Sequence, residues 1–191
     1  MSTLWGTVHI GHKGHCGFIL ETVLKSLKEK GIKSQVIDLY REKFDPILKE
    51  EEHYTAGGCE ISESNKGIQE AILQERKFII LYPTWWNSTP AILKGFFDRI
   101  LTSHFAFKYV HGIPLGLLRG KVAVISTMGG GFLVEKVILR SRSLRVVTKD
   151  ILRFCGFKSR GYGVYSAIKF NDSKKKIIQR KVRKALKYLG V

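Results

Sequence analysis

The chain has 191 residues, enough for one domain with a substantial core and too few for two ordinary domains. Its apolar share is 44%, and no apolar run approaches the ~20 residues of a membrane-spanning helix. The sequence therefore predicts a single globular domain over residues 1–191. Its first residues lack the pattern of a secretory signal, so a cytoplasmic location is expected.

The charge is strongly basic: 33 Lys and Arg against 16 Asp and Glu give a formal net charge of +17. The excess is concentrated in residues 140–145 and 174–184. Because no nucleic-acid-binding motif accompanies it, a solvated helix face is the favoured interpretation and nucleic-acid binding is not expected. Peripheral association with an acidic partner or an anionic membrane surface stays open.

The three cysteines, Cys16, Cys59 and Cys155, are scattered along the chain and form no C-x-x-C pair. Such an odd, dispersed set argues against a disulfide framework and against a zinc site. We expect reduced thiols and no bound metal.

Strands and helices alternate along the whole chain. Short apolar runs predict strands at residues 7–10, 34–39, 78–82, 122–126 and 161–166. Helical spacing of apolar residues predicts helices within 18–27, 68–73, 92–100, 134–152 and 177–189, with a cap for the last at residues 171–173. This alternation is typical of an α/β fold in which a doubly wound, five-stranded parallel sheet has helices on both faces. Ligands of such sheets bind beyond the carboxyl ends of the strands.

The first loop at that edge is G11-H-K-G-H-C-G-F18. Its glycines allow a sharp turn with free N–H groups, and the helix that follows adds a dipole favourable to a phosphate. His12 is the better placed of its two histidines as a phosphate donor. The loop matches neither the dinucleotide-binding nor the Walker pattern, and a turn that holds only water is an equal alternative.

The second loop follows the third predicted strand and reads P83-T-W-W-N-S-T-P90. Trp85 and Trp86 could form the wall of a flat pocket, with backbone N–H groups facing the polar edge of a planar heteroaromatic ligand. Alternatively, one or both indoles fill the core or a subunit contact.

The third loop, S126-T-M-G-G-G131, follows the fourth predicted strand. Its three glycines permit close approach of the main chain to a ligand, and Ser126 and Thr127 offer hydroxyl groups; a flexible tip is the alternative. The three loops would share one edge of the sheet, where a single ligand could contact all of them.

With these residues in view, the chain resembles the flavodoxin-like NAD(P)H:quinone oxidoreductases over about residues 7–165. The stretch Y82-P-T-W-W-N-S-T-P-A-I-L-K-G-F-F-D-R-I100, with F105-A-F-K-Y109 behind it, is similar to that family's P-x-W-W-x-x-P-A-x-L-K-G-W-x-D-R block. The segments V36-I-D-L-Y40, F44-D-P46 and R153-F-C-G-F157 are similar to other recurrent stretches of the family.

The resemblance implies a bound flavin, FMN or FAD, reduced by NAD(P)H and reoxidised by a small-molecule acceptor such as a quinone. It implies a homodimer whose site is partly closed by the partner's aromatic segment, and no side chain is an obligatory acid or base. The implied cofactor-binding residues are His12, Gly14, Phe18, Pro83, Thr84, Trp85, Trp86, Asn87, Ser126, Thr127, Gly129 and Gly130. The implied substrate-binding residues are Trp86, Asn87, Phe107 and Tyr109.

Two positions of the first loop depart from the family: Gly17 stands where Ser is usual and Ile19 where Asn is usual. Both changes remove polar groups that would hold a phosphate, which leaves FMN against FAD open. Arg140, Arg142 or Arg145 could meet the phosphates of NADPH, since guanidinium suits bidentate phosphate contact. The alternative functions are a flavin-binding ancillary subunit of a transporter and a flavodoxin-type electron carrier.

Overall fold

The computed structural model describes residues 3–7, 14–53, 55, 58 and 60–191. Its main sheet contains β1 (Thr3–Thr7), β2 (Ser34–Asp38), β3 (Lys77–Pro83), β6 (Lys121–Thr127) and β7 (Lys158–Val164), in the order β2-β1-β3-β6-β7. Every adjacent pair is parallel. The predicted α/β fold with a parallel sheet and packed helices is confirmed. The direction in which strands are added reverses between β1 and β3, which is where ligands of such sheets bind.

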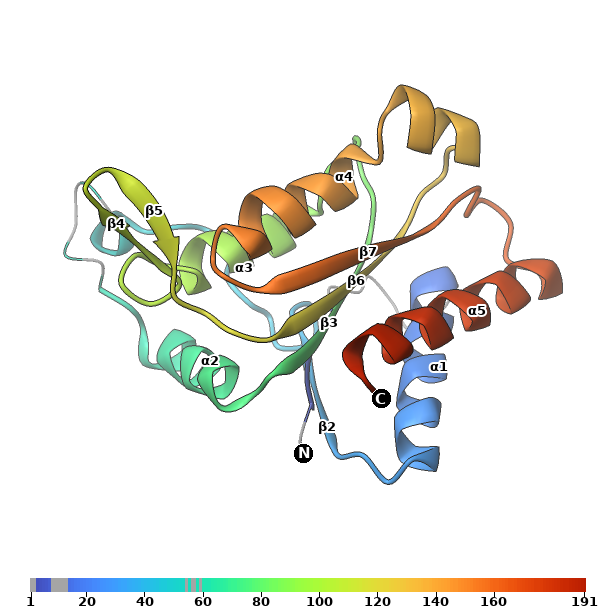
Figure 1. The fold of residues 1–191 in the computed structure, drawn as a ribbon, viewed down its shortest axis with the longest axis horizontal. Coiled ribbons are helices and arrows are strands. Elements are labelled where there is room, and N and C mark those ends of the chain that lie inside the picture. The colour runs from blue at the N-terminus through green and yellow to red at the C-terminus, as the bar shows by residue number, and fades with distance from the viewer. Residues whose placement is uncertain (1–2, 8–13, 54, 56–57, 59) are drawn as a thin grey trace.

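Helices cover both faces of this sheet (Figure 1). On one face lie α1 (His15–Glu29) and α5 (Asp172–Leu189). On the other lie α2 (Glu63–Gln74), α3 (Ala91–Ile100) and a helical segment that follows β6. None of the helices within the described residues is long and apolar enough to cross a membrane.

The central strand β6 shows why both faces need cover. Val122 and Val124 belong to the core beneath α2 and α3, whereas Ala123 and Ile125 belong to the core beneath α1 and α5. Successive side chains of a strand point to opposite faces, so a run of apolar residues is stable only between two helical layers.

The ends of the last helix follow from local chemistry. Asn171 caps α5, because its side-chain oxygen accepts a hydrogen bond from the backbone N–H of Lys174 at 2.9 Å. Gly190 ends the helix in the left-handed conformation, with φ of 72°. The predicted cap at residues 171–173 is thus confirmed.

Two predicted strand features differ in the structure. The first strand is Thr3–Thr7 rather than 7–10, and residues 8–10 lie outside the described part of the chain. A two-stranded hairpin of β4 (Phe107–Val110) and β5 (Ile113–Gly116) was not predicted. Its turn residues, His111 and Gly112, both have positive φ, as a two-residue type I′ turn requires. The strands are short and largely exposed, so their apolar pattern is weak.

The continuous helix predicted over 134–152 is wrong in one respect. The structure has a π-helical turn η2 (Val134–Ile138), then α4 (Arg142–Arg145) and the π-helical η3 (Val146–Arg153). Arg140 and Ser141 interrupt it, with φ of 51° and 47°. Neither is a glycine, so residue type did not reveal the break.

Candidate functional site

The second and third predicted loops lie side by side at the carboxyl edge of the sheet. The register pairs Pro83 of β3 with Thr127 of β6. Just beyond it, the backbone N–H of Thr84 donates to the carbonyl oxygen of Thr127 at 2.8 Å. The structure therefore brings together the two loops that the sequence predicted to meet.

Buried hydroxyl groups join these loops to α4. The hydroxyl oxygen of Thr84 lies 2.7 Å from that of Ser126 and 3.2 Å from that of Ser143. Ser143 also donates to the carbonyl oxygen of Ser88 at 3.3 Å, and the Tyr82 hydroxyl donates to the carbonyl oxygen of Ser143 at 3.1 Å. Burial raises the pKa of Tyr82 to about 12, although hydrogen bonds with Ser143 and Ser126 oppose that shift. Because these hydroxyls satisfy one another, they position the loops.

The loop after β3 closes in a strained turn. The backbones of Trp85 and Ser88 exchange two hydrogen bonds, of 3.1 and 2.8 Å. Between them Trp86 and Asn87 are both left-handed, with φ of 48° and 55°. The left-handed conformation costs roughly 1–2 kcal/mol for a residue with a Cβ. The indole of Trp86 is 100% exposed and that of Trp85 is 46% exposed, so neither fills the core of this chain.

Backbone donors at the rim are free of partners among the described residues. The N–H groups of Trp86, Asn87, Gly129 and Gly130 meet no acceptor there. The side-chain oxygen of Asn87 is buried and also lacks a partner. A Cβ built on Gly129 would meet no atom within 4 Å, so the space beside Gly129 is open, whereas a Cβ on Gly130 would collide with the Glu135 side chain. Donors beside open space fit a flat heterocycle with oxygen and nitrogen acceptors along its edge.

The first loop is only partly described. His12 lies outside the described residues, whereas Gly14, with φ of 90°, directly precedes α1. The ring of Phe18 packs edge-on against Phe170, with centroids 5.6 Å apart. The Cys16 sulfur lies 3.5 Å from the Thr127 hydroxyl, so the start of α1 borders the third loop. Burial raises the pKa of the Cys16 thiol to about 11, despite the opposing hydrogen bond.

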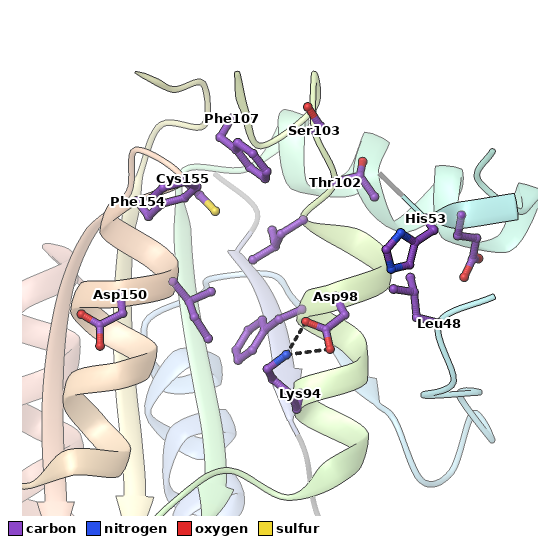
Figure 2. Close-up of a pocket in the computed structure, with 14 residues that line it drawn as sticks. Leu48, His53, Lys94, Asp98, Thr102, Ser103, Phe107, Asp150, Phe154 and Cys155 are labelled. Carbon is purple, nitrogen blue, oxygen red and sulfur yellow. Dashed lines mark hydrogen bonds and ion pairs between the residues drawn. The ribbon is translucent and has the colours of Figure 1, made fainter. Parts of the chain in front are cut away.

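The structure does not bring Phe107 and Tyr109 to the loops of their own chain. Phe107 lies on β4, where its ring packs against Phe154 at 5.0 Å and against Tyr109 at 5.9 Å. It borders a hollow of about 340 Å³ between α3 and the end of η3 (Figure 2). This hollow is lined by Lys94, Asp98, Asp150 and Phe154 among others, and by no residue of the second or third loop.

Comparison with known proteins identifies the family. A family model described as "flavodoxin-like fold" matches residues 1–189. An uncharacterized NAD(P)H oxidoreductase of Haemophilus influenzae is 32% identical over 149 residues, which cover 77% of this chain and 74% of the relative. The chain belongs to the flavodoxin-like NAD(P)H oxidoreductase family.

Other members of this family have more specific names. The FMN-dependent NADH:quinone oxidoreductase of Clostridium perfringens is 32% identical over 146 residues, 73% of this chain and 72% of the relative. The solved NAD(P)H:quinone oxidoreductase from Methanothermobacter marburgensis has a TM-score of 0.85 and 27% identity, covering 97% of this chain and 96% of that one.

The structure also explains why two stretches of the family pattern, F44-D-P46 and the block that contains D98-R99, occur together. Arg99, from the D-R pair, donates to both carboxylate oxygens of Glu52 at 2.7 and 2.6 Å, and to the carbonyl oxygen of Asp45 at 2.6 Å. A Cβ on Gly95 would collide with the backbone of Pro46. Burial is the largest single influence on the Glu52 carboxyl and raises its pKa, but the hydrogen bonds and positive charges of Arg99 and Lys49 together outweigh burial, so the pKa is lowered. These residues of α3 therefore hold the segment after β2 in place.

Sequence reasoning missed Tyr82, Ser143 and Glu52. Tyr82 lies within the predicted third strand, and only its position at the strand end could have drawn attention to its hydroxyl. Ser143 and Glu52 carry no local signal, because their partners lie 61 and 47 residues away.

Proposed function

We propose that this protein is a flavin-dependent NAD(P)H:quinone oxidoreductase. The observation that carries the proposal is the set of backbone N–H groups at Trp86, Asn87, Gly129 and Gly130 that meet no acceptor among the described residues, with open space beside Gly129 at the carboxyl edge of the sheet. The names of relatives from Clostridium perfringens and Methanothermobacter marburgensis support the same activity. A bound flavin would accept a hydride from NAD(P)H and pass two electrons to the acceptor.

The chain's own part is to bind, orient and exclude water. In this proposal the backbone of residues 83–87 and 126–130 lies along the flavin ring, while His12, Gly14 and Phe18 lie at its phosphate end. Thr84 and Ser126 act indirectly, because their hydroxyls bind each other and fix the spacing of the two loops. Donor and acceptor would use the same face in turn, beside Trp86 and Asn87, which predicts ping-pong kinetics.

The proposal includes a homodimer. The β4–β5 hairpin exposes large apolar side chains, of which Ile113 is 69% exposed and Tyr109 51% exposed. A second copy would cover them and bring Phe107 and Tyr109 towards the exposed indole of Trp86. Sedimentation of the purified protein would test this, and a monomer at micromolar concentration would contradict it.

Three further expectations belong to the proposal: residues 1–191 form a single domain, the location is cytoplasmic, and the basic surface permits peripheral association. The outer side of α5 is exposed and cationic at Lys176, Arg180, Arg183, Lys184 and Lys187. Such a surface suits an acidic partner or an anionic membrane. Association that does not weaken as salt rises would exclude an electrostatic origin.

The test of the proposed activity begins with the visible absorbance spectrum of the purified protein. A flavin spectrum is expected, and mass analysis after denaturation identifies FMN or FAD. Steady-state oxidation of NADH and NADPH should then require a quinone and give parallel double-reciprocal lines. A preparation that stays colourless after incubation with both flavins would overturn the proposal.

A further inference from the structure

A second feature beside the site is a hollow lined by arginines. It has a volume of about 460 Å³ and is bordered by Arg140, Arg142, Arg145 and Asp150, with apolar side chains between them. Its lining residues come from the end of η2, from α4 and from the start of η3. None of these residues forms part of the hydroxyl network described above.

The backbone holds the arginines in a defined turn. Arg140 and Ser141 are both left-handed, and the N–H of Ser141 donates to the carbonyl oxygen of Glu135 at 2.6 Å. The N–H of Arg145 in turn donates to the carbonyl oxygen of Ser141 at 3.0 Å. Consecutive left-handed residues other than glycine are costly, and such strain gathers at functional sites. The turn orders three cationic side chains around one space.

The three arginines are exposed, and none of them forms an ion pair among the described residues, even though Asp150 also borders the hollow. Three positive charges that line one hollow attract an anion to it. Guanidinium groups match the oxygens of a phosphate with paired hydrogen bonds.

The hollow and the hydroxyl network beside the proposed flavin site share α4. Ser143, between Arg142 and Arg145, bonds the Thr84 hydroxyl at 3.2 Å and the carbonyl oxygen of Ser88 at 3.3 Å. The inner side of this turn therefore holds the Trp86 loop, while its outer side carries the arginines. If the nicotinamide ring of a dinucleotide lies beside Trp86, as the proposed function requires, its adenosine end would extend along this turn.

We infer that the hollow binds the ribose 2′-phosphate of NADPH and makes this protein prefer NADPH to NADH. The inference rests on the proposed function, since it concerns the electron donor of the same site. The 2′-phosphate is the one group that distinguishes the two dinucleotides, so the two donors can be compared directly.

The kinetic test replaces Arg142 and Arg145 by glutamine, singly and together, with Arg183→Gln on α5 as a matched loss of one exposed positive charge. Losing charge-assisted hydrogen bonds should lower kcat/KM for NADPH by about tenfold or more in the double variant. The value for NADH should stay within about twofold, as should both values for the control. Equal losses for both donors, or no loss for NADPH, overturn the inference.

A binding test does not depend on turnover. Calorimetry with 2′-phospho-ADP-ribose and with ADP-ribose should show tighter binding of the phosphorylated compound, and Arg142→Gln should abolish the difference. Asp150→Asn should act in the opposite direction and tighten binding of 2′-phospho-ADP-ribose, because it removes a negative charge from the hollow. Equal affinity of the wild type for the two compounds overturns the inference even if both dinucleotides are oxidised. Failure to oxidise either dinucleotide would instead count against the proposed function.

Discussion

The hydroxyl oxygens of Thr84 and Ser126 lie 2.7 Å apart and join the loops that follow β3 and β6. Ser126 is fully buried, so its hydroxyl faces protein. Among the described residues, backbone N–H groups of the two loops at this rim meet no acceptor and can face a ligand. The side chains thus set the geometry, and the main chain supplies the donors.

Ser126→Ala should loosen this junction. It removes one hydrogen bond from the half-buried Thr84 hydroxyl, which keeps Ser143 as a partner, and the loss of one such hydrogen bond costs about 0.5–1.5 kcal/mol. We expect the free energy of unfolding in urea to fall by that amount and flavin to dissociate more readily. Ser173→Ala in the first turn of α5 is the control, because Ser173 is exposed and should change stability by less than about 0.5 kcal/mol. A Ser126 variant as stable as this control would contradict the proposed role of the hydroxyl.

Trp86→Gly should weaken quinone binding without lowering the stability of the monomer. The indole is fully exposed, so its removal loses no packing within the chain, and glycine adopts φ of 48° without strain. The free energy of unfolding of the monomer should stay constant or rise by about 1 kcal/mol, and the melting temperature should change in the same direction. Affinity for the quinone should fall, because the indole would form the wall of the proposed pocket. A large loss of monomer stability would show that Trp86 packs against its own chain.

Arg99→Met should be among the most damaging single changes. It leaves the buried Glu52 carboxylate without its bidentate partner, and breaking such a pair typically costs about 3–5 kcal/mol. Urea unfolding of Arg99→Met, Glu52→Gln and the double variant would measure the coupling energy. Lys94→Ala is the control, because it removes the exposed ion pair with Asp98, worth about 0–1 kcal/mol. Similar effects at Arg99 and Lys94 would contradict this assignment.

Stability should decline in alkaline solution. Burial raises the pKa of the Cys16 thiol from 9.0 to about 11 and that of Cys155 to about 12. Because the folded state favours the neutral thiols, these groups contribute to the free energy of unfolding in a pH-dependent way. Their contribution is fully present below pH 9 and is lost as the pH rises towards 11 and 12. Urea unfolding between pH 8 and 11 should show this fall, with a shallower slope in Cys16→Ala than in the wild type. Identical slopes would show that Cys16 does not titrate differently in the folded and unfolded states.

Much of the fold was predictable because it follows from local spacing. Apolar runs marked β2, β3, β6 and β7 to within a few residues, and 3.6-residue periodicity marked the helices. Right-handed crossovers then place the carboxyl ends of parallel strands at one edge, so the loops that contain Thr84 and Ser126 were expected at the same edge. The family pattern around residues 82–100 added the flavin, which spacing alone could not indicate.

The sequence by itself therefore determined the fold class and placed the loops after the third and fourth predicted strands at one edge of the sheet. Only the tertiary structure decided which hydroxyl groups bind one another and that Glu52 forms an ion pair with Arg99. It also decided that the left-handed residues Arg140 and Ser141 interrupt a helix beside a hollow lined by three arginines. The reason is that periodicity reports which face of an element is buried, whereas these features depend on contacts between distant residues. A left-handed turn made without glycine likewise leaves no mark in the amino-acid pattern.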